Sequence, residues 1–136
     1  MTPEIAALLQ VAHTHLAEAA HQLRVADRPN AAARNAYLGA PAAARAVIVT
    51  RTGKISKTHT GTRSEISRLA HIDPRIDREF ARFLSVGFEL KSWADYGEGR
   101  PHVLTPEAAA AQIAESARLI AHAAWLLAQP DPPPPA

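Results

Sequence analysis

Hydrophobic residues recur at three- and four-residue steps along most of the chain, which is the spacing of an amphipathic helix. The first apolar stripe predicts a helix over roughly residues 3–26, and Thr2 is well placed to cap its first turn. Further stripes predict helices over roughly 31–51, 60–71, 75–95 and from 106 onward. Because no segment has the alternation of a strand, the pattern predicts an all-α protein, an antiparallel bundle of about five helices.

Prolines, glycines and small polar residues mark the helix boundaries. Asn30 is placed to cap the second helix, and Thr105 to cap the last. Pro41 removes an amide donor inside the second helix, so a kink is expected near Gly39–Pro41. The proline-rich residues 129–136 predict an extended, disordered tail. The bundle is therefore expected to occupy residues 1–128 as one domain.

Composition supports close helix packing. Although 47% of the 136 residues are hydrophobic, thirty of them are Ala and only seven residues are Phe, Tyr or Trp. A β-sandwich needs more β-branched and aromatic side chains than this chain has, whereas Ala is the best helix former.

Several classes of function are excluded or disfavoured. The chain has no Cys, which excludes disulfides, thiolate zinc sites and cysteine nucleophiles. The formal net charge of +2 is small for a protein that binds polyanions strongly. No apolar run approaches eighteen residues and the N-terminus lacks a signal-peptide layout, so we expect a soluble, cytoplasmic protein without membrane contact.

Three stretches in order carry a family resemblance: KTHTG at 57–61, FELKSWADYG at 88–97 and TPEAAAAQIAESARLI at 105–120. Together they resemble a small bacterial and archaeal branch of the HEPN-domain family, whose members typically have KTHSG and FELRxxADYG at these places. The resemblance extends from the first helix to about residue 128. It implies a bundle of four or five helices that pairs into a homodimer and is often encoded beside a minimal nucleotidyltransferase in toxin–antitoxin or defence modules.

Many proteins that the chain resembles are metal-independent endoribonucleases, whose signature is an Arg followed after four to six residues by a His. No Arg here has a His at that spacing: Arg51 precedes His59 by eight positions, and only three residues separate Arg118 from His122. Members with the KTHSG motif often lack the signature as well. Its absence therefore counts against ribonuclease activity and not against membership.

His59 and Lys57 are the candidate catalytic residues. Metal-free RNA cleavage needs a base for the 2′-hydroxyl and a cation for the charge on phosphorus, and a His beside a Lys supplies both. They precede a helix N-terminus, which favours phosphate. The alternative is structural, with Thr58 or Thr60 capping the third helix and His59 packed against a neighbour.

Asp95 and Tyr96 are a second candidate pair, just before a glycine-rich turn. Asp95 could orient His59 or Lys57, and Tyr96 could stack on a base or accept a nucleotide modification. In the alternative interpretation, Asp95 pairs with an Arg of the second helix and Tyr96 closes the end of the bundle.

Arg34, Tyr37 and Arg45 are candidate RNA or partner contacts on the second helix. Arg34 and Arg45 lie eleven residues apart, about three turns, which predicts a common face. That face could meet phosphate or a partner, and a salt bridge to Asp95 or Glu89 is the alternative.

Other patterns have simpler interpretations. The arginines of residues 63–82 alternate with acidic residues, which is typical of a solvated face. The histidines of the first helix lack the spacing of a helical zinc site, so we expect no metal and no cofactor. Trp93 and Trp125 are expected to fill the core or a dimer interface.

Three hypotheses follow. The first is a non-catalytic or catalytically degenerate HEPN protein that acts through a nucleotidyltransferase partner, with RNA as a candidate ligand, within a toxin–antitoxin or defence module. The second is a metal-independent endoribonuclease toxin that uses His59 and Lys57. The third is a dimeric adaptor whose ligand is another protein.

Overall fold

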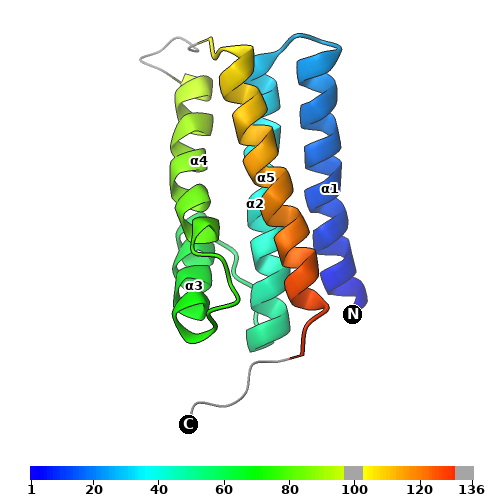
Figure 1. Cartoon of the computed structure of the whole chain (residues 1–136), viewed down its shortest axis with the longest axis vertical. Coiled ribbons are helices and arrows are strands. Elements are labelled where there is room, and N and C mark those ends of the chain that lie inside the picture. The colour runs from blue at the N-terminus through cyan, green and yellow to red at the C-terminus, as the bar shows by residue number, and fades with distance from the viewer. Residues whose placement is uncertain (97–102, 131–136) are drawn as a thin grey trace.

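The computed structural model describes residues 1–96 and 103–130, and over these residues the chain is a helical bundle (Figure 1). The five helices are α1 (Pro3–Arg24), α2 (Pro29–Thr52), α3 (His59–Ile72), α4 (Glu79–Tyr96) and α5 (Pro106–Leu127). The described residues include no strand, so the predicted all-α fold class is confirmed. None of the described helices is long and apolar enough to cross a bilayer.

Threonine side chains cap three of the helices. Thr2 accepts a hydrogen bond from the Ile5 amide at 3.2 Å, Thr58 from Gly61 at 2.9 Å and Thr105 from Ala108 at 3.1 Å. Each cap satisfies an amide that has no partner inside its helix. The caps predicted at Thr2 and Thr105 are confirmed, and Thr58 fixes where α3 begins, with His59 as its first residue.

Helix α2 lies at the centre and contacts each of the other four helices. Its alanines from Ala32 to Ala46 are largely buried, and small side chains let neighbouring helices approach closely. At Gly39 a Cβ atom would lie 3.0 Å from both the Ala12 carbonyl oxygen and the Ile120 side chain. Glycine is therefore needed where α1, α2 and α5 meet. Helix α2 continues through Pro41.

The shorter helices α3 and α4 follow one another along one side of the bundle (Figure 1). They complete the core with the buried side chains of Ile66, Phe80 and Leu84, which join Ile48 and Leu119 of α2 and α5 in one cluster. Because α3 and α4 also contact each other and α2, residues from the start of α3, the middle of α4 and α2 can share one site.

Two predicted boundaries were wrong for identifiable reasons. Arg28, not Asn30, is the N-cap residue of α2 and makes no side-chain cap, while the side-chain oxygen Oδ1 of Asn30 accepts a hydrogen bond from the Leu104 backbone amide at 2.7 Å. Helix α4 begins at Glu79 and not near 75, because a turn around Asp73 occupies the preceding residues.

The two tryptophans do not fill the core. Trp93 is 44% and Trp125 is 48% exposed, which corrects that part of the expectation, while the interface interpretation remains a prediction. Of the predicted tail, only Gln129 and Pro130 are among the described residues. The carbonyl oxygen of Pro130 accepts a hydrogen bond from Arg75 at 3.0 Å.

Candidate functional site

A cavity of about 280 Å³, the Tyr37 cavity, lies where α1, α2, α3 and α4 come together. Its volume is just below the roughly 300–1,000 Å³ of typical small-ligand clefts. It is lined by Val11, His15, Tyr37, Leu38, Pro41, Ala42, Arg45, His59, Phe88 and Lys91. The lining thus combines apolar side chains with cationic and imidazole groups. It includes Tyr37, Arg45 and His59, which the sequence analysis selected.

Tyr37 and His59 form the polar centre of the cavity. The Tyr37 hydroxyl lies 2.7 Å from Nδ1 of His59, and a longer 3.4 Å hydrogen bond links the hydroxyl to the Leu84 carbonyl oxygen. Tyr37 is only 3% exposed. Burial raises the pKa of the Tyr37 hydroxyl to about 12, against the opposing effect of Arg45 and Arg63, so Tyr37 keeps its proton at neutral pH.

Phe88 holds the other side of His59. The two rings are stacked with centroids 4.1 Å apart, and the Lys91 ammonium lies 5.7 Å from the centroid of the Phe88 ring. The same ammonium pairs with Asp95 one turn later at 3.0 Å. His59 therefore packs against a neighbour, as the structural alternative proposed, and it does so at the wall of the cavity.

The imidazole of His59 is held neutral. Burial, followed by the positive charges of Arg63 and Arg45, lowers its pKa below the ordinary value near 6.5. At neutral pH the ring therefore has one protonated and one unprotonated nitrogen. Such a ring can donate or accept one hydrogen bond, or act as a proton acceptor.

Arg45 and Arg63 place positive charge beside this ring. Nε of Arg45 donates to the Thr62 hydroxyl at 3.3 Å, and Arg63 donates to the Ser85 hydroxyl at 3.4 Å. The described residues provide no carboxylate partner for either arginine. Two half-buried guanidinium groups without a counterion attract an anion, and the arginine fork matches the oxygens of a phosphate.

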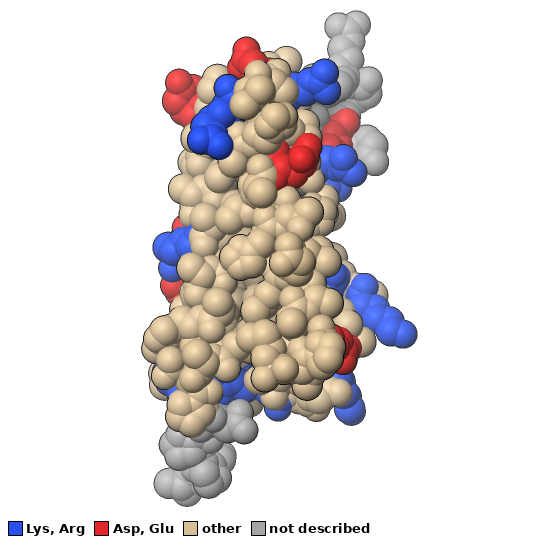
Figure 2. Space-filling view, turned by 90° about the vertical axis from the view of Figure 1, so that its right-hand side faces the viewer, with Lys and Arg blue, Asp and Glu red and all other residues tan. Residues whose placement is uncertain are grey.

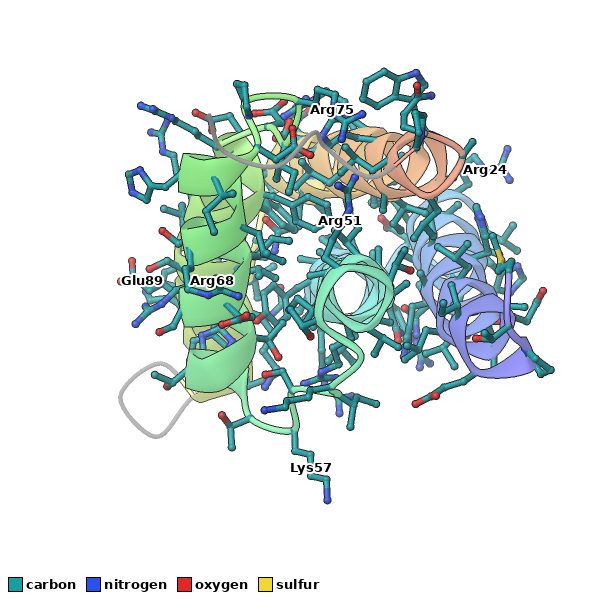
Figure 3. All side chains as sticks on the ribbon, turned by 90° about the horizontal axis from the view of Figure 1, so that it is seen from below. Arg24, Arg51, Lys57, Arg68, Arg75 and Glu89 are labelled. Atoms are coloured by element: carbon teal, nitrogen blue, oxygen red, sulfur yellow. The ribbon has the colours of Figure 1, made fainter. Side chains whose placement is uncertain are left out.

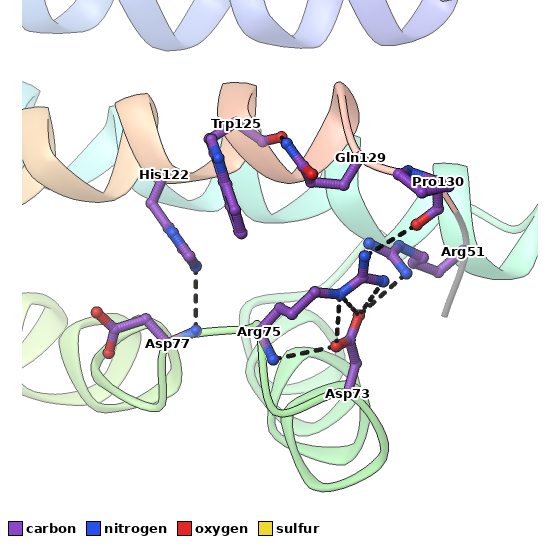
Figure 4. Close-up of polar contacts among 8 residues, drawn as sticks. All are labelled: Arg51, Asp73, Arg75, Asp77, His122, Trp125, Gln129 and Pro130. Carbon is purple, nitrogen blue, oxygen red and sulfur yellow. Dashed lines mark hydrogen bonds and ion pairs between the residues drawn. The ribbon is translucent and has the colours of Figure 1, made fainter. Parts of the chain in front are cut away.

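A different arrangement holds the arginines at the end of the bundle where α2 and α3 finish (Figure 4). Asp73 accepts from Arg51 at 3.1 Å and from Arg75 at 2.9 Å, and the carboxyl and Arg51 side chains are only 5% and 7% exposed. The Arg75 guanidinium and its backbone amide hold the pKa of Asp73 below the usual range. Here the Asp73 carboxylate already neutralises the charge of the arginines, so we assign this cluster a structural role.

A wider groove of about 450 Å³ runs past the connection between α2 and α3. Its cations include Lys54 and Arg68, and Arg68 is paired with Glu65. Arg82 is likewise exposed and paired with Glu79, which agrees with the solvated face predicted for residues 63–82. Arg75 does not fit that prediction, because its partner Asp73 is buried. Arg63 departs from that expectation, since it lies beside the Tyr37 cavity.

The other residues selected from the sequence lie in different places. Lys57 is exposed and extends away from the bundle (Figure 3), so it does not line the cavity. Arg34 is exposed, whereas Arg45 of the same helix is half-buried. Asp95 pairs with Lys91 and not with an arginine of α2. Tyr96 is the last residue of α4, but its side chain lies outside the described residues.

Sequence reasoning missed four members of the site. Phe88 and Lys91 belong to the FELK segment, where only the later ADYG residues were considered, and Arg63 was assigned to a solvated face. His15 was considered only as a metal ligand. A helical projection places His15 four residues after Val11 on the stripe facing α2, and this was the available signal. Among the described residues, no three His, Asp or Glu side chains could together hold a metal ion.

Comparison with protein families agrees with this fold. The chain matches the family model of the HEPN domain over residues 5–124. The protein therefore belongs to the HEPN domain family, as the resemblance of its motifs predicted. No curated protein matches the chain. The assignment to the small bacterial and archaeal branch remains a prediction.

Proposed function

We propose that this HEPN protein binds RNA through the Tyr37 cavity, as a component of a toxin–antitoxin or defence module that works with a nucleotidyltransferase partner. The observation that carries the RNA-binding proposal is the pair of half-buried arginines, Arg45 and Arg63, that have no carboxylate partner among the described residues. The partner is inferred from the family resemblance.

The cavity offers two kinds of contact with a nucleotide. Arg45 and Lys91 are donors for phosphate oxygens, and His59 and Phe88 supply aromatic rings of the type on which bases stack. A site with a few fixed contacts also agrees with the small net charge of the chain, because it needs no long basic stripe.

The α1 side is the candidate surface for the expected homodimer. Figure 2 faces the α1 side of the molecule, whose central part carries no Lys, Arg, Asp or Glu, with charged groups around its edges. An uncharged helix face is suited to packing against a second copy, because charged residues are depleted in the core of an interface.

The experiment is a titration of a short fluorescently labelled oligouridine RNA with the purified chain at low salt, followed by anisotropy. Arg45→Met keeps much of the side-chain volume and removes the charge. We expect it to weaken binding roughly ten- to hundredfold, which corresponds to one lost charged hydrogen bond. Arg34→Met, on the same helix but exposed, is the matched control and should bind as the wild type does.

Equal affinity of the Arg45→Met and Arg34→Met proteins would refute the cavity as the binding site. Absence of binding by the wild type would refute RNA as the ligand and favour the adaptor hypothesis, in which the exposed Trp93 and Trp125 contact a protein.

One observation favours a second candidate function, the metal-independent endoribonuclease. His59 is neutral beside Arg45, which gives a proton acceptor next to a cation even though the Arg–His signature is absent. RNA cleavage in EDTA should then be abolished by His59→Ala. It should persist in Lys57→Ala if Arg45 supplies the cation, and loss of activity in Lys57→Ala would restore Lys57 to the site.

A further inference from the structure

His15 of α1 lines the same cavity, and its hydrogen bonds determine which ring nitrogen carries the proton. Nδ1 of His15 lies 3.2 Å from Oδ1 of Asn35. The side-chain amide of Asn35 is oriented by its Nδ2 group, which donates to Oε1 of Gln22 at 2.7 Å and to the carbonyl oxygen of Ala31 at 3.4 Å. A backbone carbonyl oxygen only accepts, so the NH₂ group faces Ala31 and the amide oxygen faces His15.

An amide oxygen also only accepts, so the His15 nitrogen that faces Asn35 must be the donor. The neutral ring therefore carries its proton on Nδ1 and has an unshared electron pair on Nε2. No partner for this Nε2 occurs within the described part of the chain. Around the same cavity, the charged groups of Arg45 and Lys91 have donors alone.

A hydrogen-bond acceptor next to two cations restricts the ligand. Phosphate oxygens accept hydrogen bonds and would be satisfied by Arg45 and Lys91, but they offer nothing to Nε2 of His15. The ligand must present a donor close to its anionic group. In a nucleic-acid backbone that donor is the ribose 2′-hydroxyl, which DNA lacks.

We infer that His15 makes the cavity selective for RNA over DNA by accepting a hydrogen bond from a ribose 2′-hydroxyl beside a phosphate bound by Arg45. The inference rests on the proposed function, since it specifies what the RNA-binding cavity recognises. A volume of about 280 Å³ suits one sugar and its phosphate better than a longer segment.

The test compares three probes of one length and base: oligouridine, oligodeoxyuridine and 2′-O-methyl oligouridine. The methylated probe keeps the 2′-oxygen but has no proton to donate. We expect the wild type to bind oligouridine about two- to tenfold more tightly than either of the other probes, as for one net hydrogen bond. His15→Phe should bind all three alike, whereas His13→Phe, at an exposed position of the same helix, should keep the preference.

Asn35→Leu is a second variant that leaves His15 in place. It removes the acceptor that fixes the proton on Nδ1, so the preference for oligouridine should shrink. Far-ultraviolet circular dichroism establishes that each variant is folded before binding is measured.

Equal binding of the three probes by the wild type would overturn the inference and leave RNA binding intact. An undiminished preference in a folded His15→Phe protein would overturn it too. If none of the probes binds to the wild type, the proposed function fails and the inference fails with it.

Discussion

Two regions of the molecule each hold a pair of half-buried arginines, and they differ in what compensates the charge. At the end of the bundle, Arg51 and Arg75 share the buried carboxylate of Asp73. In and beside the Tyr37 cavity, Arg45 donates to the Thr62 hydroxyl and Arg63 to the Ser85 hydroxyl, which orient a guanidinium without neutralising it. The first arrangement neutralises the arginines within the fold, whereas the second leaves them without a carboxylate partner among the described residues.

The histidines of the two regions extend the comparison. His122 of α5 accepts a hydrogen bond from the Asp77 amide at 3.1 Å, which ties α5 to the turn before α4 (Figure 4). Burial lowers its pKa, while nearby Asp77 acts to raise it. For His59 both charged neighbours are cations, which act in the same direction as burial. His59 is therefore neutral, and its contacts are the Tyr37 hydroxyl and the stacked Phe88 ring.

The largest expected effect is the loss of stability when the Asp73 carboxylate is removed. Asp73→Asn leaves two arginines without their carboxylate, and we expect the free energy of unfolding to fall by about 3–5 kcal/mol, as for other broken buried ion pairs. Urea unfolding measures this loss. RNA affinity should stay within twofold under conditions where the variant is folded.

Asp27→Asn is the control for this variant. Asp27 is exposed and has a positive φ of 50°, a conformation that asparagine tolerates, so stability should be unchanged. If Asp73→Asn loses no more stability than Asp27→Asn, the Asp73 carboxylate does not stabilise the fold in the way proposed.

Removing two helix caps, one at a time, distinguishes an effect on stability from an effect on RNA binding. Thr58→Ala and Thr105→Ala each remove a side-chain cap, and each should lower the free energy of unfolding by about 1 kcal/mol. Only Thr58 fixes the first turn of α3, from which His59 reaches the cavity. Thr58→Ala should therefore weaken RNA binding while Thr105→Ala does not, and equal affinities of the two variants would argue against a site at the start of α3.

The salt dependence of RNA binding tests whether Arg63 contacts a phosphate. For a single-stranded RNA, removing one phosphate contact reduces the slope of log affinity against log salt by about 0.7. We expect this reduction for Arg63→Met and an unchanged slope for Arg78→Met, whose side chain is exposed. An unchanged slope in both variants would remove Arg63 from the interface.

Acid should destabilise the fold in two stages. Because the pKa of His59 is lower in the folded than in the unfolded chain, its contribution to stability is fully present above about pH 6.5 and is lost as the pH falls through the folded value. The lowered pKa of Asp73 adds a second loss at more acidic pH. Thermal unfolding of His59→Gln should show a flatter first stage than the wild type, and identical profiles would contradict the burial of a neutral His59.

Helix positions were predictable from the sequence because they depend on local signals. Apolar spacing and the caps at Thr2 and Thr105 placed the helices to within a few residues. The failures arose from contacts distant in sequence: Asn30 bonds to Leu104 instead of capping, and the turn around Asp73 delays the start of α4.

The site was predictable only in part. His59, Tyr37 and Arg45 were selected from motif and residue type, and the fold brings them together. Whether an arginine has a carboxylate partner depends on which residues lie next to it in the fold. Periodicity alone could therefore not distinguish Arg63 from Arg68, which is paired with Glu65. The position of the proton on His15 depends on Asn35 of the neighbouring helix, and residue spacing does not reveal that contact.

The most direct test of the account is an NMR titration of the histidine ring nitrogens with short oligouridine RNA. His59 and His15 line the cavity, and His122 is a half-buried histidine outside it. The account predicts that the ring resonances of His59 and His15 shift with saturation while those of His122 stay in place. Saturating shifts at His122, with His59 and His15 unchanged, would contradict it.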